Sequence, residues 1–377
     1  MATETNVGRT LRTPEDFDAQ VREGVRNLVE NCAEVEASET IVLVNDGTRI
    51  DTAMSATIEE AIQRRHAKSA VLWVEPLEGE QRYLSARRRP FTLSPEQAKT
   101  LCGADRVIVH ADAEHLIPYL ADASKKPLIV QNRSATAESL AASESRYPWG
   151  IADAIHEVLN HDIFLEGARW RITAPNGTDI HGAVPEPTLR ASYFEDEVGG
   201  TGVDRSFHSS AYLPVGSADA EGIIVVEWMD GTKLNAAHDP AYLEIGGNRM
   251  KGIAGGLQDP KWLDDFWSAT QDLVERFGDQ ALVIDSWHSG THPQTTSWAG
   301  GTRHLHFHLG RTTGKVGDFV WAGIKYFTLT VNDQPVSING RLAILDHPKV
   351  RAAAERYNYQ GWREAWPASN HWQVGSA

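Results

Sequence analysis

Residues 39–44 read ETIVLV, an apolar and β-branched run that leads directly into Asn45-Asp46-Gly47. Three more runs of this kind follow, and segments with helical spacing separate them: residues 69–74 (SAVLWV), 106–110 (RVIVH) and 126–131 (KPLIVQ). Continuous apolar strands that alternate with helices are typical of a parallel sheet covered on both faces. The sequence therefore predicts an α/β, Rossmann-like domain over residues 1–155. Because it contains no GxGxxG or GxxxxGK[ST] motif, we expect no nucleotide site there.

The pattern changes beyond residue 155. Residues 169–181 form two alternating runs around Asn176-Gly177, which indicates a β-hairpin. A helix is expected over residues 260–276, and further strands over residues 222–228, 281–285, 303–309 and 325–331. We therefore expect residues 156–377 to form an α+β domain that has a mostly antiparallel, curved sheet and binds a metal.

Composition limits the function. The chain has 377 residues and a formal net charge of −15, which argues against nucleic acid or an anionic membrane as the main partner. No signal peptide and no membrane-length apolar run is visible, and the two cysteines, Cys32 and Cys102, fit a reducing compartment. We expect a cytoplasmic protein, with a homodimer left open. Any metal must be held by histidine and carboxylate.

The candidate metal site is centred on a strand of histidines. His304, His306 and His308 alternate with Leu305, Phe307 and Leu309, so the imidazoles share one face and the apolar side chains the other. His288 and His292 lie just upstream, after Asp285, and neighbouring strands bring such ligands to one ion. We expect at least two of these five histidines to bind one divalent transition metal; Mn, Zn and Fe all suit these ligand types. A metal-free histidine cluster for acid–base chemistry is the alternative.

Five other residues are candidates for catalysis or substrate binding. Glu227 ends an apolar run, so it is either a ligand or general base, or a cap for the turn that follows. Asp285 is the second catalytic candidate. Arg303 and Arg311 flank the histidine strand and are placed to bind a substrate carboxylate, unless they are ordinary surface charges. Trp287 and Trp298 lie in loops beside the histidines and are candidates to contact a flat aromatic ligand, whereas most tryptophans are core residues.

Several segments resemble the aminopeptidase T-like metalloenzyme superfamily. Residues 171–180 (RITAPNGTDI) resemble its V-T-x-P-x-G-T-D-L hairpin, residues 212–216 (YLPVG) with 222–225 (GIIV) resemble N-x-P-x-G-E…G-x-V-V, and residues 306–310 (HFHLG) resemble H-I-A-L-G. The order and spacing agree over roughly residues 150–335. Besides peptidases, the superfamily contains 2,5-dihydroxypyridine 5,6-dioxygenase, an iron enzyme, and 5-nitroanthranilic acid aminohydrolase.

The sequence departs from the peptidase pattern at three places. Ser217 stands where the peptidases have a glutamate ligand, and Asp285-Ser286 stands near another. Residues 324–327 (IKYF) align with the late H-x-D-F motif and supply no ligand, so only His306 carries over as a family metal ligand. Because a two-metal peptidase centre needs more ligands than remain, a single-metal site is expected.

The resemblance implies a metal-dependent hydrolase acting on a C–N bond. Its most specific expectation is deamination of a carboxylated aromatic amine, 5-nitroanthranilate to 5-nitrosalicylate and ammonia, as in nitroaromatic catabolism. A ring-cleaving, non-haem Fe(II) dioxygenase is the first alternative and a metalloaminopeptidase the second. A metal-binding protein without catalysis is also left open.

Overall fold

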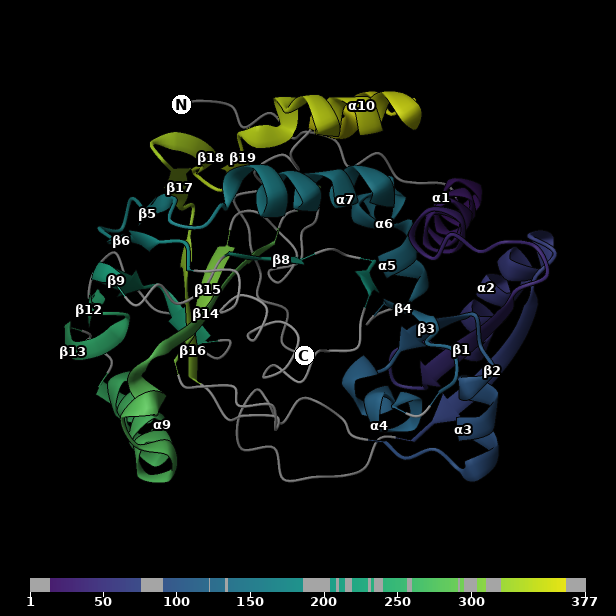
Figure 1. Cartoon of the computed structure of the whole chain (residues 1–377), viewed down its shortest axis with the longest axis horizontal. Coiled ribbons are helices and arrows are strands. Elements are labelled where there is room, and N and C mark those ends of the chain that lie inside the picture. Colours follow the sequence, from purple (N-terminus) through teal and green to yellow (C-terminus); the bar gives the residue numbers. More distant parts are fainter. Residues whose placement is uncertain are drawn as a thin grey trace, which may run out of the picture.

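The chain folds into two halves that lie side by side (Figure 1). The computed structural model describes residues 14–75, 91–121, 123–132, 135–185, 204–207, 210–213, 219–229, 232–233, 240–255, 260–290, 292–294, 304–309 and 320–363. Within these ranges, no helix is long and apolar enough to cross a membrane.

The first half is the predicted parallel sheet with helices. Its strand order is β2-β1-β3-β4-β7, and every pair in it is parallel. The strands are β1 (Thr40–Asp46), β2 (Lys68–Val74), β3 (Arg106–His110), β4 (Leu128–Gln131) and β7 (Arg205–Ser206). The helices are α1 (Pro14–Arg26), which continues as a π-helical turn (Asn27–Cys32), α2 (Thr52–Arg64), α3 (Pro95–Cys102), α4 (Ile117–Leu120), α5 (Ala137–Ala141) and α6 (Ser143–Arg146). Separate apolar cores cover the two faces of the sheet, as the continuous apolar strands predicted.

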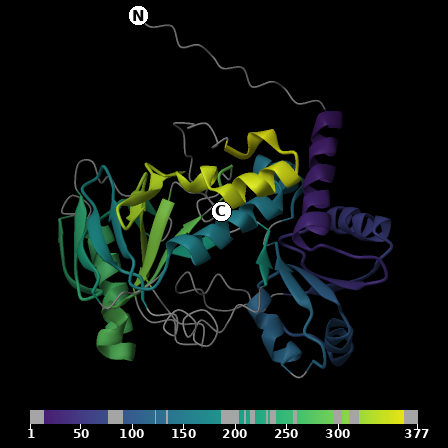
Figure 2. The same cartoon turned by 45° about the horizontal axis from the view of Figure 1, so that its top comes forward.

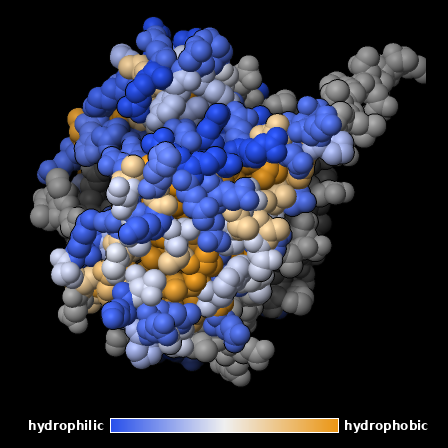
Figure 3. Space-filling view, turned by 90° about the vertical axis from the view of Figure 1, so that its right-hand side faces the viewer, coloured by the Kyte–Doolittle hydropathy of each residue, from blue (hydrophilic) through white to orange (hydrophobic). Residues whose placement is uncertain are grey.

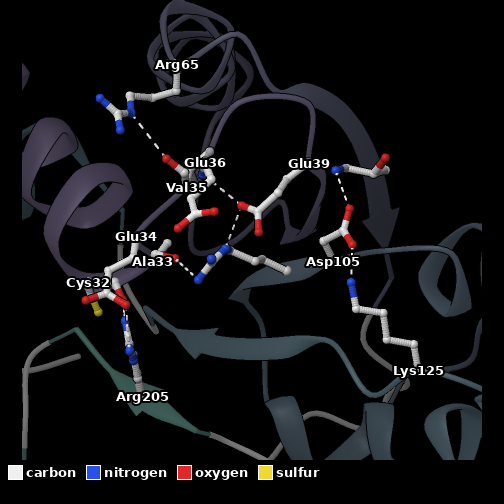
Figure 4. Close-up of polar contacts among 12 residues, drawn as sticks. Cys32, Ala33, Glu34, Val35, Glu36, Glu39, Arg65, Asp105, Lys125 and Arg205 are labelled. Carbon is white, nitrogen blue, oxygen red and sulfur yellow. Dashed lines mark hydrogen bonds and ion pairs between the residues drawn. The ribbon is translucent and has the colours of Figure 1, made fainter.

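Strand β7 comes from beyond residue 200 and returns to this sheet (Figure 4). The Arg205 guanidinium donates to the carbonyl oxygen of Cys32 at 2.7 Å, pairs with Glu34 at 2.8 Å and lies over the Trp149 ring. Arg106 likewise donates to the carbonyl of Ala33 at 2.7 Å. These arginines satisfy carbonyl groups that the end of the first helix leaves without helical partners.

The second half contains two antiparallel sheets. A six-stranded sheet has the order β11-β10-β16-β15-β14-β8, and an eight-stranded sheet has the order β13-β12-β9-β6-β5-β17-β18-β19. The strands of the six-stranded sheet are β8 (Ser210–Leu213), β10 (Trp228–Met229), β11 (Thr232–Lys233), β14 (Ile284–Gly290), β15 (His304–Leu309) and β16 (Val320–Lys325). Those of the eight-stranded sheet are β5 (Arg169–Thr173), β6 (Asp179–Ala183), β9 (Glu221–Val226), β12 (Ala241–Gly246), β13 (Arg249–Gly255), β17 (Thr328–Val331), β18 (Gln334–Ile338) and β19 (Arg341–Leu342). The predicted hairpin around Asn176-Gly177 is β5–β6, and helix α9 (Pro260–Phe277) also lies where it was expected.

Three strands predicted as single runs differ in the structure. The run over residues 222–228 divides at Glu227, where the chain passes from β9 in one sheet to β10 in the other. The run over 325–331 divides in the same way between β16 and β17, with Tyr326 at a φ of 51°. Residues 278–282 form a 3-10 turn, so β14 begins only at Ile284. Sequence periodicity does not show where a chain changes sheets.

Helices α7 (Trp149–Val158) and α10 (Pro348–Arg356) lie at the top of Figure 1, and Figure 2 shows them side by side. Ile151, Ile155 and Val158 of α7 share one buried core with Val350 of α10 and with the two antiparallel sheets. The domain boundary expected at residue 155 thus falls inside a helix whose apolar face packs in the second half. Since β7 also returns to the first half, the chain crosses between the halves more than once.

The surface on the α/β side is mainly hydrophilic, with apolar patches near its centre (Figure 3). Strand β2 forms an edge of the parallel sheet in this half, and its Trp73 is 40% exposed. Such an edge leaves backbone groups available for pairing.

Candidate functional site

Strand β15 has the two faces that its sequence predicted. Leu305, Phe307 and Leu309 are fully buried in the core between the antiparallel sheets. Alternation then places positions 304, 306 and 308 on the opposite face, which is turned away from this core. The histidine pattern therefore reflects a real division of the strand into an apolar and an imidazole face.

Neighbouring strands place further candidates beside His306. In the antiparallel register, His306 lies opposite position 288 of β14 on one side and Gly323 of β16 on the other. Directly opposite positions belong to the same sheet face. Gly323 itself contributes no side chain to this face beside His306.

Both described imidazoles of β15 are buried. His304 is 6% exposed and His306 is 9% exposed. Burial, together with a smaller effect of the nearby His304, lowers the pKa of His306 to about 3. His306 is therefore neutral at physiological pH, which is the form in which imidazole binds a metal ion.

Glu227 lies at the crossing between the two antiparallel sheets. Its backbone N–H donates to the carbonyl oxygen of Gly323, the residue paired with His306, at 2.9 Å. Its carboxylate accepts a hydrogen bond from the Asn176 amide at 3.1 Å, and the same amide donates to the carbonyl of Val225 at 2.9 Å. Glu227 is thus held by the β5–β6 turn.

Sequence reasoning missed Asn176 and Thr178 as residues that organise this corner. The Thr178 hydroxyl accepts from the backbone N–H of Val225 at 2.9 Å, and the Asn176 amide oxygen accepts from the N–H of Thr178 at 3.0 Å. The PNGTD segment was interpreted as a turn alone. Its hydrogen-bonding side chains were the available signal for a link to another strand.

His292 occupies a packed aromatic cluster. It is 1% exposed, its ring lies 4.8 Å from that of Tyr147, and its Nδ1 accepts from the backbone N–H of Gln294 at 3.2 Å. The Gln294 side chain is held in turn by Tyr359 and by the carbonyl of Gly361. Burial, the Tyr147 ring and the Gln294 backbone thus fix the position of the His292 ring.

Trp287 lies in the core. It is 1% exposed and packs against Phe307 at 5.4 Å and Trp170 at 6.1 Å between ring centroids. Phe307 belongs to the face of β15 opposite His306, and Trp170 belongs to β5 of the eight-stranded sheet. This position corrects the expectation that Trp287 contacts a bound aromatic ligand, because an alternating strand sends it to the other side.

Other candidates fall outside the described residues. These are Arg303, Arg311 and Trp298 entirely, together with the side chains of Asp285, His288 and His308, for which the structure gives only the backbone. Within the described residues, no three His, Cys, Asp or Glu side chains form a group that could hold a metal ion.

No protein-family model and no curated protein matches the sequence. Among solved structures, 2,5-dihydroxypyridine dioxygenase from Pseudomonas putida KT2440 is similar with a TM-score of 0.58 and 15% identity, covering 89% of this chain and 99% of that chain. The chain shares the fold of that dioxygenase. AmpT from Thermus thermophilus gives a TM-score of 0.46 and 12% identity over 87% of this chain and 100% of its own. The first similarity agrees with the two-part architecture that the motif resemblance implied. It concerns the fold alone, because one fold can host unrelated chemistries.

Proposed function

We propose that the chain is an enzyme that binds one divalent transition ion on the histidine face of β15 and acts on a small carboxylated aromatic compound. The observation that carries this proposal is the pair His304 and His306, both buried on the face of the strand that is not packed in the core. Neutral imidazole nitrogens on one strand face are suitable ligands for a divalent transition ion. His288 or His308 completes the ligand set, because both positions adjoin His306 in the sheet.

The proposed reaction is hydrolytic deamination of an aromatic amine, with 5-nitroanthranilate as the leading substrate. A bound ion of this kind makes hydroxide available near neutral pH. Glu227 or Asp285 removes a proton from the attacking water and delivers it to the leaving ammonia. Arg303 and Arg311 hold the substrate carboxylate, and Trp298 contacts the ring. The absence of the peptidase residues at Ser217 and at residues 324–327 supports this class over aminopeptidase activity.

A ring-cleaving, oxygen-dependent reaction is the second candidate. It is supported by the shared fold with 2,5-dihydroxypyridine dioxygenase. Two histidines plus one carboxylate with open positions also suit non-haem iron. In that case Asp285 is the proposed carboxylate, since it lies on β14 beside the histidine strand.

An anaerobic assay separates these reactions. Protein reconstituted with manganese, zinc or iron is incubated with 5-nitroanthranilate, and released ammonia is measured. Ammonia without oxygen supports the hydrolase. Consumption of 2,5-dihydroxypyridine only when oxygen is present supports the dioxygenase instead. Cleavage of leucine amides, with neither aromatic consumed, would contradict both proposals and favour the aminopeptidase.

A histidine variant tests the metal site itself. We expect the metal content of the His306→Ala protein to fall from about one ion per chain to almost none, because the substitution removes a neutral buried ligand. Elemental analysis after gel filtration measures this, together with circular dichroism to confirm folding. His181→Ala is the matched control, since His181 is exposed on β6 and should leave metal content unchanged. Full metal content in His306→Ala would show that β15 is not the site.

A further inference from the structure

A row of side chains crosses the carboxyl ends of the parallel sheet, separate from the histidine strand. Asn45 at the end of β1 lies opposite His110 at the end of β3. One residue earlier Val109 pairs with Gln131, so Asn132 follows beside His110. Gln131 pairs with Ser206 of β7, which places Phe207 next in the row. Three adjacent strands thus present polar groups at one level.

The row lies where the sheet changes winding direction. From β1 the chain moves outward to β2, and it then returns past β1 to β3 on the other side. In open α/β sheets, ligands bind outside the carboxyl ends of the strands at this kind of switch point. Position at a switch point indicates a ligand site only as a general tendency. The stronger evidence is the burial and hydrogen bonding of the three polar side chains.

His110 presents one ring nitrogen to this row. It is fully buried, and its Nδ1 lies 2.9 Å from the carbonyl oxygen of Asn132. A carbonyl only accepts, so Nδ1 carries the proton. Burial lowers the pKa of His110 to about 4, so the ring is neutral and Nε2 is an acceptor. In the described part of the chain, Nε2 has no hydrogen-bond partner.

Asn45 and Asn132 add complementary groups. Asn45 is fully buried, and its Nδ2 donates to the Ser55 hydroxyl at 2.9 Å. Among the described residues, its Oδ1 has no partner, and neither amide atom of the 1% exposed Asn132 has one. A buried polar atom without a partner costs about 1–3 kcal/mol, so three such side chains together indicate a missing partner.

The charged groups beside the row are already paired. Both carboxylate oxygens of Asp112 accept from Arg49, at 3.0 and 2.9 Å. Asp46 accepts from the backbone and hydroxyl of Thr48 at 2.8 Å each. The row itself therefore offers neutral acceptors and one amide donor, which favours a neutral ligand over an ion.

We propose that Asn45, His110 and Asn132 form a binding site for a small neutral molecule that donates two hydrogen bonds and accepts one. The donors go to Oδ1 of Asn45 and Nε2 of His110, and the Asn132 amide donates in return. Phe207, 2% exposed, provides an apolar neighbour at the end of the row. A resident water and the primary amide end of a small compound share this chemistry.

High-resolution crystal structures of the full chain, grown with and without acetamide, test the proposal. Density within hydrogen-bonding distance of all three groups in both crystals supports a resident water. Acetamide in that place supports a site for a small ligand. If neither crystal shows density for a bound molecule, and Asn45 Oδ1 and His110 Nε2 form hydrogen bonds to protein groups instead, the proposal is overturned.

A second measurement avoids dependence on crystals. Asn45→Val, His110→Leu and the double variant are compared by thermal unfolding. If one molecule bridges both side chains, the double variant loses less melting temperature than the sum of the single losses, although the two side chains share no direct bond. The ¹⁵N shift of Nε2 in wild-type protein should also be that of a hydrogen-bonded acceptor. Additive losses with the shift of an unbonded nitrogen would contradict a shared ligand.

Discussion

At the scale of single residues, His110 makes stability depend on pH. Its pKa is about 4 in the folded chain, against about 6.5 when exposed. Between these values the unfolded chain binds a proton that the folded chain does not, so stability falls as the pH drops from about 6.5 to 4. The loss from this one group reaches roughly 3 kcal/mol. We expect His110→Gln to lose less stability than wild type between pH 7 and 4.5, as measured by urea unfolding.

Other titratable groups contribute equally to wild type and to His110→Gln. The difference between the two proteins in the slope of unfolding free energy against pH therefore measures the contribution of His110. His181→Gln is the control, because His181 is exposed and should keep the wild-type slope. Identical slopes in wild type and His110→Gln would mean that the folded chain accommodates the charged ring.

At the scale of elements, strand β9 depends on Gly222. This residue has a φ of 138° and packs against β6, where an added Cβ would lie 2.7 Å from the Cα of Ile180 and collide with the carbonyl oxygen of Asp179. Backbone strain and the collision act together, because the β6 backbone cannot move away without breaking its pairing. We expect Gly222→Ala to lower the free energy of unfolding by more than about 2 kcal/mol.

Gly47→Ala is the matched control for urea unfolding. Gly47 has a negative φ and open space where a Cβ would be, so its change should stay within about 0.5 kcal/mol. Equal urea midpoints for Gly222→Ala and Gly47→Ala would show that β6 and β9 can move apart with little loss of unfolding free energy.

At the scale of the whole molecule, Arg205 stabilises the contact between strand β7 and the first half of the chain. It bonds the carbonyl of Cys32 and the carboxylate of Glu34. Cys32 is fully buried, so its thiol reacts only when this region opens. We expect Arg205→Ala to raise the rate of Cys32 alkylation at least about tenfold, because losing about 1.4 kcal/mol of local stability increases the open population by that factor.

Peptide mass spectrometry after timed alkylation measures this rate, and Cys102 on α3 serves as an internal reference in the same protein. Arg171→Ala is the second control, since its pair with Asp179 is exposed and worth little. An unchanged Cys32 rate in Arg205→Ala would show that β7 is held by its backbone pairing alone.

The sequence by itself determined the local patterns. Four apolar runs predicted β1 to β4, and β1 and β3 show the reason, because a strand buried on both faces needs apolar residues at nearly every position. Alternation predicted the two faces of β15, and Asn-Gly predicted the β5–β6 turn. Each of these features depends on side chains a few residues apart, so a short stretch of sequence is enough to predict it.

Only the tertiary structure decided which distant elements meet. It returned β7 to the first sheet, changed sheets at Glu227 and Tyr326, and assigned Trp287 to the core and His292 to the Tyr147 cluster. It also brought Asn45, His110 and Asn132 into one row, although they lie on three separate strands. Periodicity reports which face a residue occupies. The partner across that face is set by packing between segments far apart in the chain, and no local spacing encodes it.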